Sequence, residues 1–235
     1  MAAPVVETHG LGKTFGQHHV LRDIDFRLLP GRGTFIIGAN GAGKSTLLKI
    51  IAGLSTPTAG HALVFGLDSR ELTARYRRRI GLVSHQSFLY PNLTARENLE
   101  FYGVLYALSD PRALAVRWLE QVGLARYADN RVREFSRGME QRLATARAML
   151  AEPALLLLDE PFASLDNEGE AIVAGLIRHA MTMGASVVAS AHSAAEIEGV
   201  DFEMLEISRA TLAPLRSKEK PEGRGIARLR SLLGR

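Results

Sequence analysis

The chain has 235 residues, 46% of them hydrophobic, and a formal net charge of +4, which allows one domain with a sizeable buried core and an inserted subdomain. It contains no cysteine, and this excludes disulfide frameworks and thiolate metal sites. No apolar run approaches the roughly 20 residues that a membrane-spanning helix needs, and the first residues lack the pattern of a secretory signal, so we expect any membrane role to depend on a partner protein.

Short apolar runs alternate with helical patterns along the chain, which predicts a mostly parallel sheet covered by helices. The first thirty residues have the pattern of short strands, and we expect them to form a small antiparallel β layer beside the core. Four later segments are continuous apolar runs, as strands covered on both faces require: Thr34–Gly38, Ile80–Ser84, Ala154–Asp159 and Ser186–Ser190.

The segment Gly38–Leu48, GANGAGKSTLL, matches the phosphate-binding pattern G-x-x-x-x-G-K-[ST], with a strand predicted before it and a helix after it. Glycines let backbone N–H groups approach phosphates, and the N-terminus of the helix favours negative charge. We expect Lys44 to neutralise the β- and γ-phosphates and the Ser45 hydroxyl to hold Mg²⁺. A glycine-rich turn without a ligand is the weaker interpretation.

Residues 91–152 differ from the flanking segments because their pattern is helical almost throughout. Thr94 and Glu97 form a capping box ahead of one helix, and Asp110–Pro111 provides an N-cap and a first-turn proline for the next. Ser136 caps a third helix. We expect these residues to form a helical subdomain inserted into the α/β core.

A second anion-binding helix end follows in Phe135–Arg142, FSRGMEQR, where Ser136 and Gly138 stand at the start of the third helix. Backbone N–H groups, a hydroxyl and the helix dipole all favour negative charge there. One triphosphate does not need two such ends from the same chain. We therefore expect a second copy to offer its own end to the γ-phosphate of the first, so that ATP holds a dimer together.

Two acidic residues, Asp159 and Glu160, stand at the end of the third apolar run. This places them at the carboxyl edge of the sheet, where open α/β sheets bind ligands. We expect Asp159 to bind Mg²⁺ directly or through water and Glu160 to polarise the attacking water, because phosphoryl transfer depends on positioning and charge neutralisation. The sequence thus predicts an α/β fold of the P-loop NTPase (RecA-like) class with ATP and Mg²⁺ as cofactors.

Across nearly its whole length the chain resembles the ATP-binding subunits of ATP-binding cassette (ABC) transporters. The matching residues occur in the family's order: Phe15 for adenine stacking, the Walker A residues Gly38, Asn40, Gly41, Gly43, Lys44, Ser45 and Thr46, the Q-loop Gln86, the signature residues Ser136 and Gly138, the Walker B residues Asp159 and Glu160, the D-loop Asp166 and the switch His192.

The resemblance implies a role for each residue. Gln86 would sense Mg²⁺ and the attacking water and link the core to the helical subdomain. Glu160 would be the general base and His192 would contact the γ-phosphate. Asp166 would couple the two sites of a dimer. His85, beside Gln86, is expected to be a sheet-edge histidine without a further role.

The signature motif departs from the family pattern. Phe135, Arg137 and Met139 stand where the family has Leu, Gly and Gln. Ser136 and Gly138, to which the resemblance assigns the γ-phosphate of the opposite subunit, are retained. We therefore expect a site that hydrolyses ATP.

The resemblance also implies an organisation. Residues 1–215 would form the nucleotide-binding domain, with an α/β core from residues 1–90 and 153–215, the helical subdomain of residues 91–152, and a basic tail of residues 216–235. Its partners would be separate transmembrane subunits and a second ATP-binding subunit, in a homodimer or heterodimer. The expected location is the cytoplasmic face of the cell membrane.

Within the family, the chain most resembles the haem-exporter ATPases of bacterial cytochrome c biogenesis. Drug, lipid and polysaccharide exporter ATPases share much of the same pattern and remain alternatives. An alternative from another functional class is a nucleotide-gated clamp, an assembly or regulatory factor that binds partners without transport. Residues 88–90, just past Gln86, belong either to the core or to a groove that receives a short helix from a membrane partner.

The positive charge is concentrated at the C-terminus, where residues 216–235 hold seven Lys or Arg and two Glu. Such a tail is typical of contacts with nucleic acid or an anionic membrane surface, and also of a solvated terminus. We expect a solvated terminus and no nucleic-acid partner. The helical spacing of its apolar residues leaves a membrane-surface or partner contact as the alternative.

Overall fold

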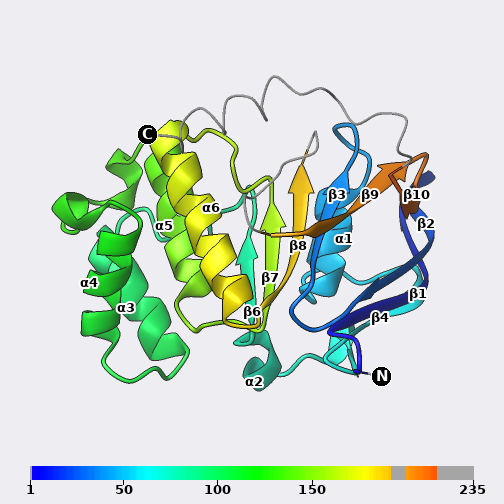
Figure 1. Cartoon of the computed structure of the whole chain (residues 1–235), viewed down its shortest axis with the longest axis horizontal. Coiled ribbons are helices and arrows are strands. Elements are labelled where there is room, and N and C mark those ends of the chain that lie inside the picture. Colours follow the sequence, from blue (N-terminus) through cyan, green and yellow to red (C-terminus); the bar gives the residue numbers. More distant parts are fainter. Residues whose placement is uncertain (1, 192–199, 216–235) are drawn as a thin grey trace.

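The computed structural model describes residues 2–191 and 200–215 (Figure 1). The predictions for His192 and for the basic tail therefore lie outside the described residues. Within the described part, the chain forms a six-stranded sheet, a four-stranded sheet and a set of helices. No helix in that part combines the length and the apolar composition that crossing a membrane requires.

The six-stranded sheet has the strand order β10-β9-β3-β8-β7-β6, and its pairs are parallel except for β9 with β10. Its strands are β3 (Gly33–Ile37), β6 (Ile80–Val83), β7 (Leu155–Asp159), β8 (Ser186–Ala191), β9 (Phe202–Ser208) and β10 (Thr211–Pro214). The four strands predicted from apolar runs are β3, β6, β7 and β8, and all four are confirmed to within one residue at each end.

The second sheet is antiparallel, with the order β2-β1-β4-β5. Its strands are β1 (Val6–Phe15), β2 (His18–Leu28), β4 (Ala59–Val64) and β5 (Leu67–Asp68). The predicted antiparallel layer is confirmed, but β1 and β2 have 10 and 11 residues rather than being short. Their length is not evident from the sequence because polar residues interrupt the apolar pattern in both strands, as Gly10 and Gly12 do in β1.

Six α-helices complete the described fold. They are α1 (Lys44–Ile51), α2 (Ala74–Arg77), α3 (Ala95–Leu105), α4 (Pro111–Gln121), α5 (Arg137–Met149) and α6 (Asn167–Thr182), with short 3₁₀ turns at Ser69–Glu71, Ala125–Tyr127 and Val132–Glu134. The sequence-predicted α/β architecture is therefore confirmed, with α3, α4 and α5 inside residues 91–152. The division into a core and a separate helical subdomain stays a prediction.

The starts of three helices follow the predicted caps. Thr94 Oγ1 accepts from the Glu97 N–H at 3.1 Å while Glu97 Oε2 accepts from the Thr94 N–H at 2.8 Å, which completes the capping box. Asp110 Oδ1 caps α4 and Ser136 Oγ caps α5, each by accepting a backbone N–H of the first turn. Satisfying these otherwise unpaired N–H groups fixes where each helix begins.

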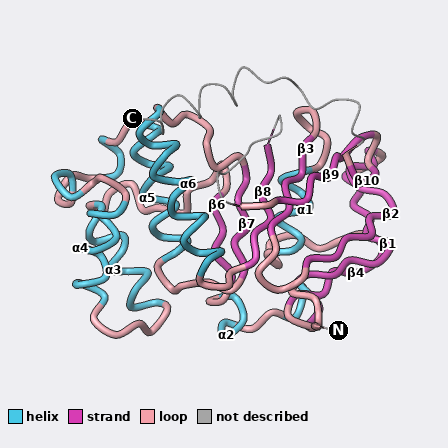
Figure 2. Tube along the Cα trace, viewed as in Figure 1, coloured by secondary structure: helices cyan, strands magenta, loops and turns pink. Residues whose placement is uncertain are grey.

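Both faces of the six-stranded sheet are buried, and successive residues of β7 point to different cores. Leu156 and Leu158 pack in a core shared with α3, α4, α5 and α6. Leu155 and Leu157 pack in a second core, shared with α1 and the four-stranded sheet. Figure 2 shows this arrangement, with α3 to α6 gathered on one side of the strands and the four-stranded sheet on the other. The period-two alternation of a strand produces both cores from one apolar run.

Candidate active site

The parallel strands bring the predicted site segments to one edge of the sheet. The strand β3 is hydrogen-bonded to β8, β8 to β7, and β7 to β6. Because these strands run in the same direction, their carboxyl ends lie together, and the loop after β3 approaches the acidic end of β7. Crevices at this edge are where α/β sheets bind ligands.

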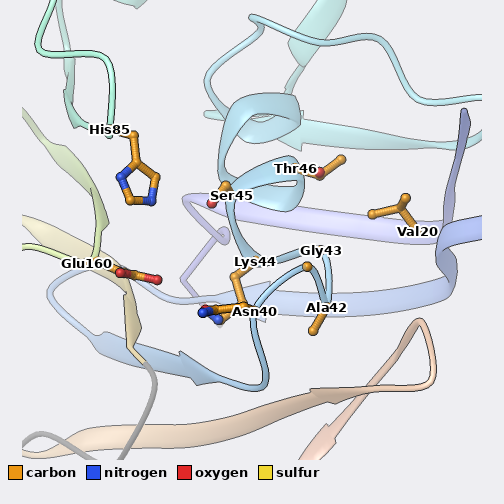
Figure 3. Close-up of a pocket in the computed structure, with 10 residues that line it drawn as sticks. Val20, Asn40, Ala42, Gly43, Lys44, Ser45, Thr46, His85 and Glu160 are labelled. Carbon is orange, nitrogen blue, oxygen red and sulfur yellow. The ribbon is translucent and has the colours of Figure 1, made fainter.

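A pocket of about 440 Å³ lies at this edge (Figure 3). It is lined by Val20, Asn40, Gly41, Ala42, Gly43, Lys44, Ser45, Thr46, His85 and Glu160. The structure therefore brings most of the predicted Walker A residues together with the predicted general base, although the latter lies more than a hundred residues later in the chain. Val20, Ala42 and His85 are lining residues that were not among the predicted site residues.

The shape of the loop depends on two glycines. Gly43 has φ +110°, and a Cβ on it would lie 2.8 Å from the Val20 carbonyl oxygen. Gly38 has φ +154°, and a Cβ on it would lie 2.6 Å from the Ile207 carbonyl oxygen. Only glycine combines these dihedral angles with such close approaches. These two glycines thus let the loop pack closely against β2 and β9. At Gly41, which lines the pocket, a Cβ would meet nothing within 4 Å, so the backbone there is open to a phosphate group.

The charge at the loop fits an anion as well. Lys44 is 5% exposed, and its Nζ donates to the carbonyl oxygens of Gly38 at 2.7 Å and Ala39 at 3.1 Å. The ammonium group is therefore held against the loop. The first turn of α1 begins here, so its unpaired N–H groups add positive potential on the same side. The lysine and the N–H groups of the loop therefore fit the phosphate groups of a nucleoside triphosphate.

The acidic end of β7 is organised by a serine of β8. Asp159 is 4% exposed, and its Oδ1 accepts a hydrogen bond of 2.6 Å from Ser190 Oγ. The same Ser190 hydroxyl accepts the Glu160 N–H at 3.1 Å. Glu160 has φ +52°, so the chain turns sharply after the strand and Glu160 lines the pocket. Ser190 was not predicted, although a serine at the end of an apolar strand was a usable signal.

A buried carboxylate favours a nearby cation, and Asp159 therefore fits Mg²⁺. Among the described residues no group of three or more His, Cys, Asp or Glu side chains could hold a metal ion. Magnesium commonly combines one or two protein ligands with substrate phosphates and water. Ser45 and Asp159 are of the residue types that would supply the protein ligands in this pattern; Ser45 lines the pocket, whereas Asp159 is not among its lining residues.

Other predicted site residues are not among those that line the pocket. Phe15 is 55% exposed at the end of β1, with Lys13 Nζ 4.8 Å from the centre of its ring. Gln86 is also absent from the lining, where the neighbouring His85 is present. His85, expected to be only a sheet-edge histidine, is among the lining residues, and its role stays a prediction.

The predicted signature and D-loop residues lie together, away from the lining of the pocket. Ser136 is exposed at the start of α5, and a Cβ on Gly138 would lie 3.0 Å from the Ser164 carbonyl oxygen. Asp166 caps α6 by accepting the Gly169 N–H at 2.8 Å. The helix end predicted to bind an anion therefore does not line the pocket of its own chain.

The fold and the glycine loop together define a P-loop nucleoside triphosphatase, as the sequence predicted. The chain belongs to the ABC transporter family, because the family model described as ABC transporter matches residues 21–163. It carries the ATP-binding domain of that family.

Proteins with related sequences have several named roles. Linearmycin resistance ATP-binding protein LnrL of Bacillus subtilis is 32% identical over 83% of this chain and 63% of that protein. Cytochrome c biogenesis ATP-binding export protein CcmA of Sodalis glossinidius is 35% identical over 78% of this chain and 87% of that protein. Sulfate/thiosulfate import ATP-binding protein CysA of Escherichia coli is 40% identical over 69% of this chain and 46% of that protein. The relatives thus include proteins named for export and for import, and the chain spans 63% of the length of LnrL.

Solved structures agree with the family. The ATP-binding subunit of an ABC transporter superposes with a TM-score of 0.81 at 28% identity, covering 98% of this chain and all of that one. A dimeric ATP-binding cassette in a post-hydrolysis state with ADP and Pi superposes with the same TM-score at 27% identity, covering 90% of this chain and 99% of that one.

Proposed function

We propose that the chain is an ATP-hydrolysing subunit of an ABC transporter. One observation carries the proposal: Lys44 and Ser45 of the glycine loop share a pocket with Glu160. A cation and backbone donors for phosphate thus face a carboxylate that can accept a proton, which is the set of groups that phosphoryl transfer to water needs.

The residues have separate tasks in this proposal. Lys44 and the N–H groups of the loop bind and orient the triphosphate. Ser45 and Asp159 hold Mg²⁺, which when bound neutralises phosphate charge. Glu160 accepts the proton of the attacking water. His192 contacts the γ-phosphate from the segment after β8, as the family resemblance implies.

We also propose that the pocket is completed by a second ATP-binding subunit. Ser136 and Gly138 are outside the lining of their own pocket, and Ser136 is exposed. A partner's helix end would add a hydroxyl and N–H donors to the γ-phosphate. Asp166, which caps α6, would couple the two sites. The likeness to a dimeric cassette bound to ADP and Pi supports this arrangement.

The membrane subunits of the transporter would bind an apolar surface on the helical part of the chain. Tyr90, Phe101, Val104 and Leu105 are exposed by 41% to 69%. The Tyr90 and Phe101 rings contact each other, with their centres 4.9 Å apart. Exposed apolar side chains gathered in this way are typical of protein interfaces. In this proposal the chain works at the cytoplasmic face of the membrane.

For the cargo we propose haem export of the cytochrome c biogenesis type. The support is the resemblance of the sequence and the 35% identity to CcmA. Relatives named for linearmycin resistance and for sulfate import share similar identity, so the nucleotide site carries no information on cargo. Deleting the gene in its host should abolish covalent haem attachment to cytochrome c; normal cytochrome c would reject this cargo and leave the ATPase proposal intact.

The ATPase proposal is tested on the purified chain. We expect Mg²⁺-dependent release of phosphate from ATP, lost with EDTA and in Lys44→Ala. Affinity capture from membrane extract should recover proteins with several membrane spans. Recovery of soluble partners alone, with ATP binding intact, would favour the nucleotide-gated clamp instead.

A further inference from the structure

We propose that His9 and His61 together bind a divalent transition metal such as Zn²⁺ on the exposed face of the four-stranded sheet. The inference goes beyond ATP hydrolysis, because neither histidine lines the nucleotide pocket. Imidazole nitrogen is a good ligand for zinc, copper and nickel, whereas Mg²⁺ prefers oxygen ligands. The proposed site is therefore distinct in its chemistry from the proposed magnesium site.

The pairing of β1 with β4 brings the two histidines together. These strands lie side by side (Figure 1), and His9 stands directly opposite His61 in their antiparallel ladder. The neighbouring pair, Thr8 and Ala62, is buried, whereas His9 and His61 are exposed. Because successive side chains of a strand point to opposite faces, both imidazoles lie on the solvent face of the sheet.

The spacing of the two rings suits one shared metal ion. The ring centres of His9 and His61 are 5.1 Å apart, and the ring planes are tilted by 43°. A zinc ion lies about 2 Å from each nitrogen ligand, and with tetrahedral geometry this places the centres of two bound rings roughly 5 Å apart. One ion can therefore bind a nitrogen of each ring with little movement of either strand.

The ring nitrogens of this pair are available to a metal. Neither imidazole donates or accepts a hydrogen bond within residues 2–191 and 200–215. A neutral imidazole has one nitrogen lone pair, so the pair offers two. His18 and His19 of β2 differ, because neighbours on a strand point to opposite faces and His19 Nδ1 lies 3.0 Å from Thr14 Oγ1.

A carboxylate adds negative charge beside the pair. Glu7 lies two residues before His9 on β1, and its Oε1 is 3.7 Å from His9 Nε2. The described residues contain no set of three or more His, Cys, Asp or Glu side chains that could hold a metal ion. We therefore assign two protein ligands to the ion, with water in the remaining positions, and Glu7 attracts the cation by its charge.

A glycine lets the two strands approach closely beside the histidines. Gly60 has φ +64°, and a Cβ on it would lie 2.3 Å from the carbonyl oxygens of His9 and Gly10. Only glycine fits this position. The backbones of β1 and β4 are thus packed against each other at the site, and ligands carried by regular strands are held more precisely than ligands on loops.

Titration of the untagged chain with Zn²⁺, without nucleotide, tests the site by calorimetry. We expect His9→Gln and His61→Gln each to weaken binding at least as much as loss of an outer-shell partner does, about tenfold or more. The double variant should lose little more, because removing either ligand already ends the chelation. His18→Gln is the matched control, because His18 is also an exposed strand histidine, and it should bind Zn²⁺ as the parent does.

Thermal unfolding gives a second measurement. A ligand that binds only the folded chain stabilises it, so Zn²⁺ should raise the melting temperature of the parent and of His18→Gln. The same concentration should raise it less in His9→Gln and His61→Gln. Both substituted side chains are exposed, so the variants should fold and melt like the parent in EDTA.

The pattern of losses decides the proposal. If His9→Gln and His61→Gln bind Zn²⁺ as the parent does, the site is wrong. It is also wrong if the two losses add up in the double variant, because the histidines then bind zinc independently. Equal weakening in His18→Gln would show zinc bound to scattered histidines and would likewise overturn the shared site.

Discussion

Ser190 Oγ donates a hydrogen bond of 2.6 Å to Asp159 Oδ1 and accepts one of 3.1 Å from the Glu160 N–H. Ser190 is fully buried and stands opposite Asp159 in the parallel ladder of β7 and β8. One hydroxyl therefore orients the proposed metal ligand and the backbone of the proposed general base together. This makes Ser190 a positioning residue, which acts on the chemistry through its two neighbours.

We expect Ser190→Ala to raise the Mg²⁺ concentration that ATP hydrolysis requires by on the order of tenfold, because residues that orient a metal ligand typically contribute that much to metal affinity. Ser190→Thr keeps the hydroxyl, so its Mg²⁺ requirement should be lower than that of Ser190→Ala. The measurement is the rate of phosphate release as a function of Mg²⁺ at saturating ATP. A purely structural role would lower the melting temperature of Ser190→Ala without changing its Mg²⁺ dependence.

Glu160→Gln should separate binding from hydrolysis. The amide keeps the size of the side chain but cannot accept the proton of water, so turnover should fall by on the order of a hundredfold or more. Loss of one negative charge near the phosphates should leave ATP binding intact or stronger. ATP should then hold the variant as a dimer in size-exclusion chromatography, and ADP should not. Unchanged turnover would remove Glu160 from its assigned role.

A mixture of two inactive variants tests the shared site. Lys44→Ala disables the glycine loop of one copy, and Ser136→Ala disables the helix end of the other. If Ser136 acts on the opposite copy, a mixed dimer contains one intact pocket, made of the unaltered loop and the unaltered helix end. We expect the mixture to regain ATP hydrolysis that neither variant shows alone. If Ser136 acts within its own chain, both pockets of the mixed dimer stay damaged and no activity returns.

Much of the site could be predicted from the sequence because its signals are local. The glycine loop is a contiguous pattern, and the strand before it and the strand that ends in Asp159 are continuous apolar runs. The caps at Thr94, Asp110 and Ser136 depend on residues within one turn of each helix. The two partners of each capping hydrogen bond are only three residues apart, so a short stretch of sequence contains both.

Other features depend on contacts that the sequence separates widely. The strand β9 alternates between buried and exposed residues, and β10 is mostly exposed, so neither has the continuous apolar run by which the inner strands were recognised. The loop after β6 is hydrogen-bonded through Ser87 to Glu140 and Arg147, which lie 53 and 60 residues away in the sequence. A local sequence pattern does not identify hydrogen bonds between residues that are this far apart in the chain.

Arg147 provides the last prediction, on stability. Its guanidinium donates to the Leu82 and Ser87 carbonyl oxygens and lies 5.5 Å from the centre of the Phe88 ring, and burial lowers its pKa. Arg147→Leu removes these charged donors and leaves buried carbonyl groups unpaired. We expect a loss of about 3 kcal/mol in the free energy of unfolding.

For a chain of this size, that loss lowers the melting temperature by roughly 10 °C, which differential scanning fluorimetry detects. Arg112→Leu on α4 is the matched control, because Arg112 is exposed and its replacement should cost less than about 0.5 kcal/mol. Equal melting temperatures for the two variants would contradict the prediction. Because Arg147 ties α5 to the loop after β6, adding ATP should also stabilise Arg147→Leu less than it stabilises Arg112→Leu.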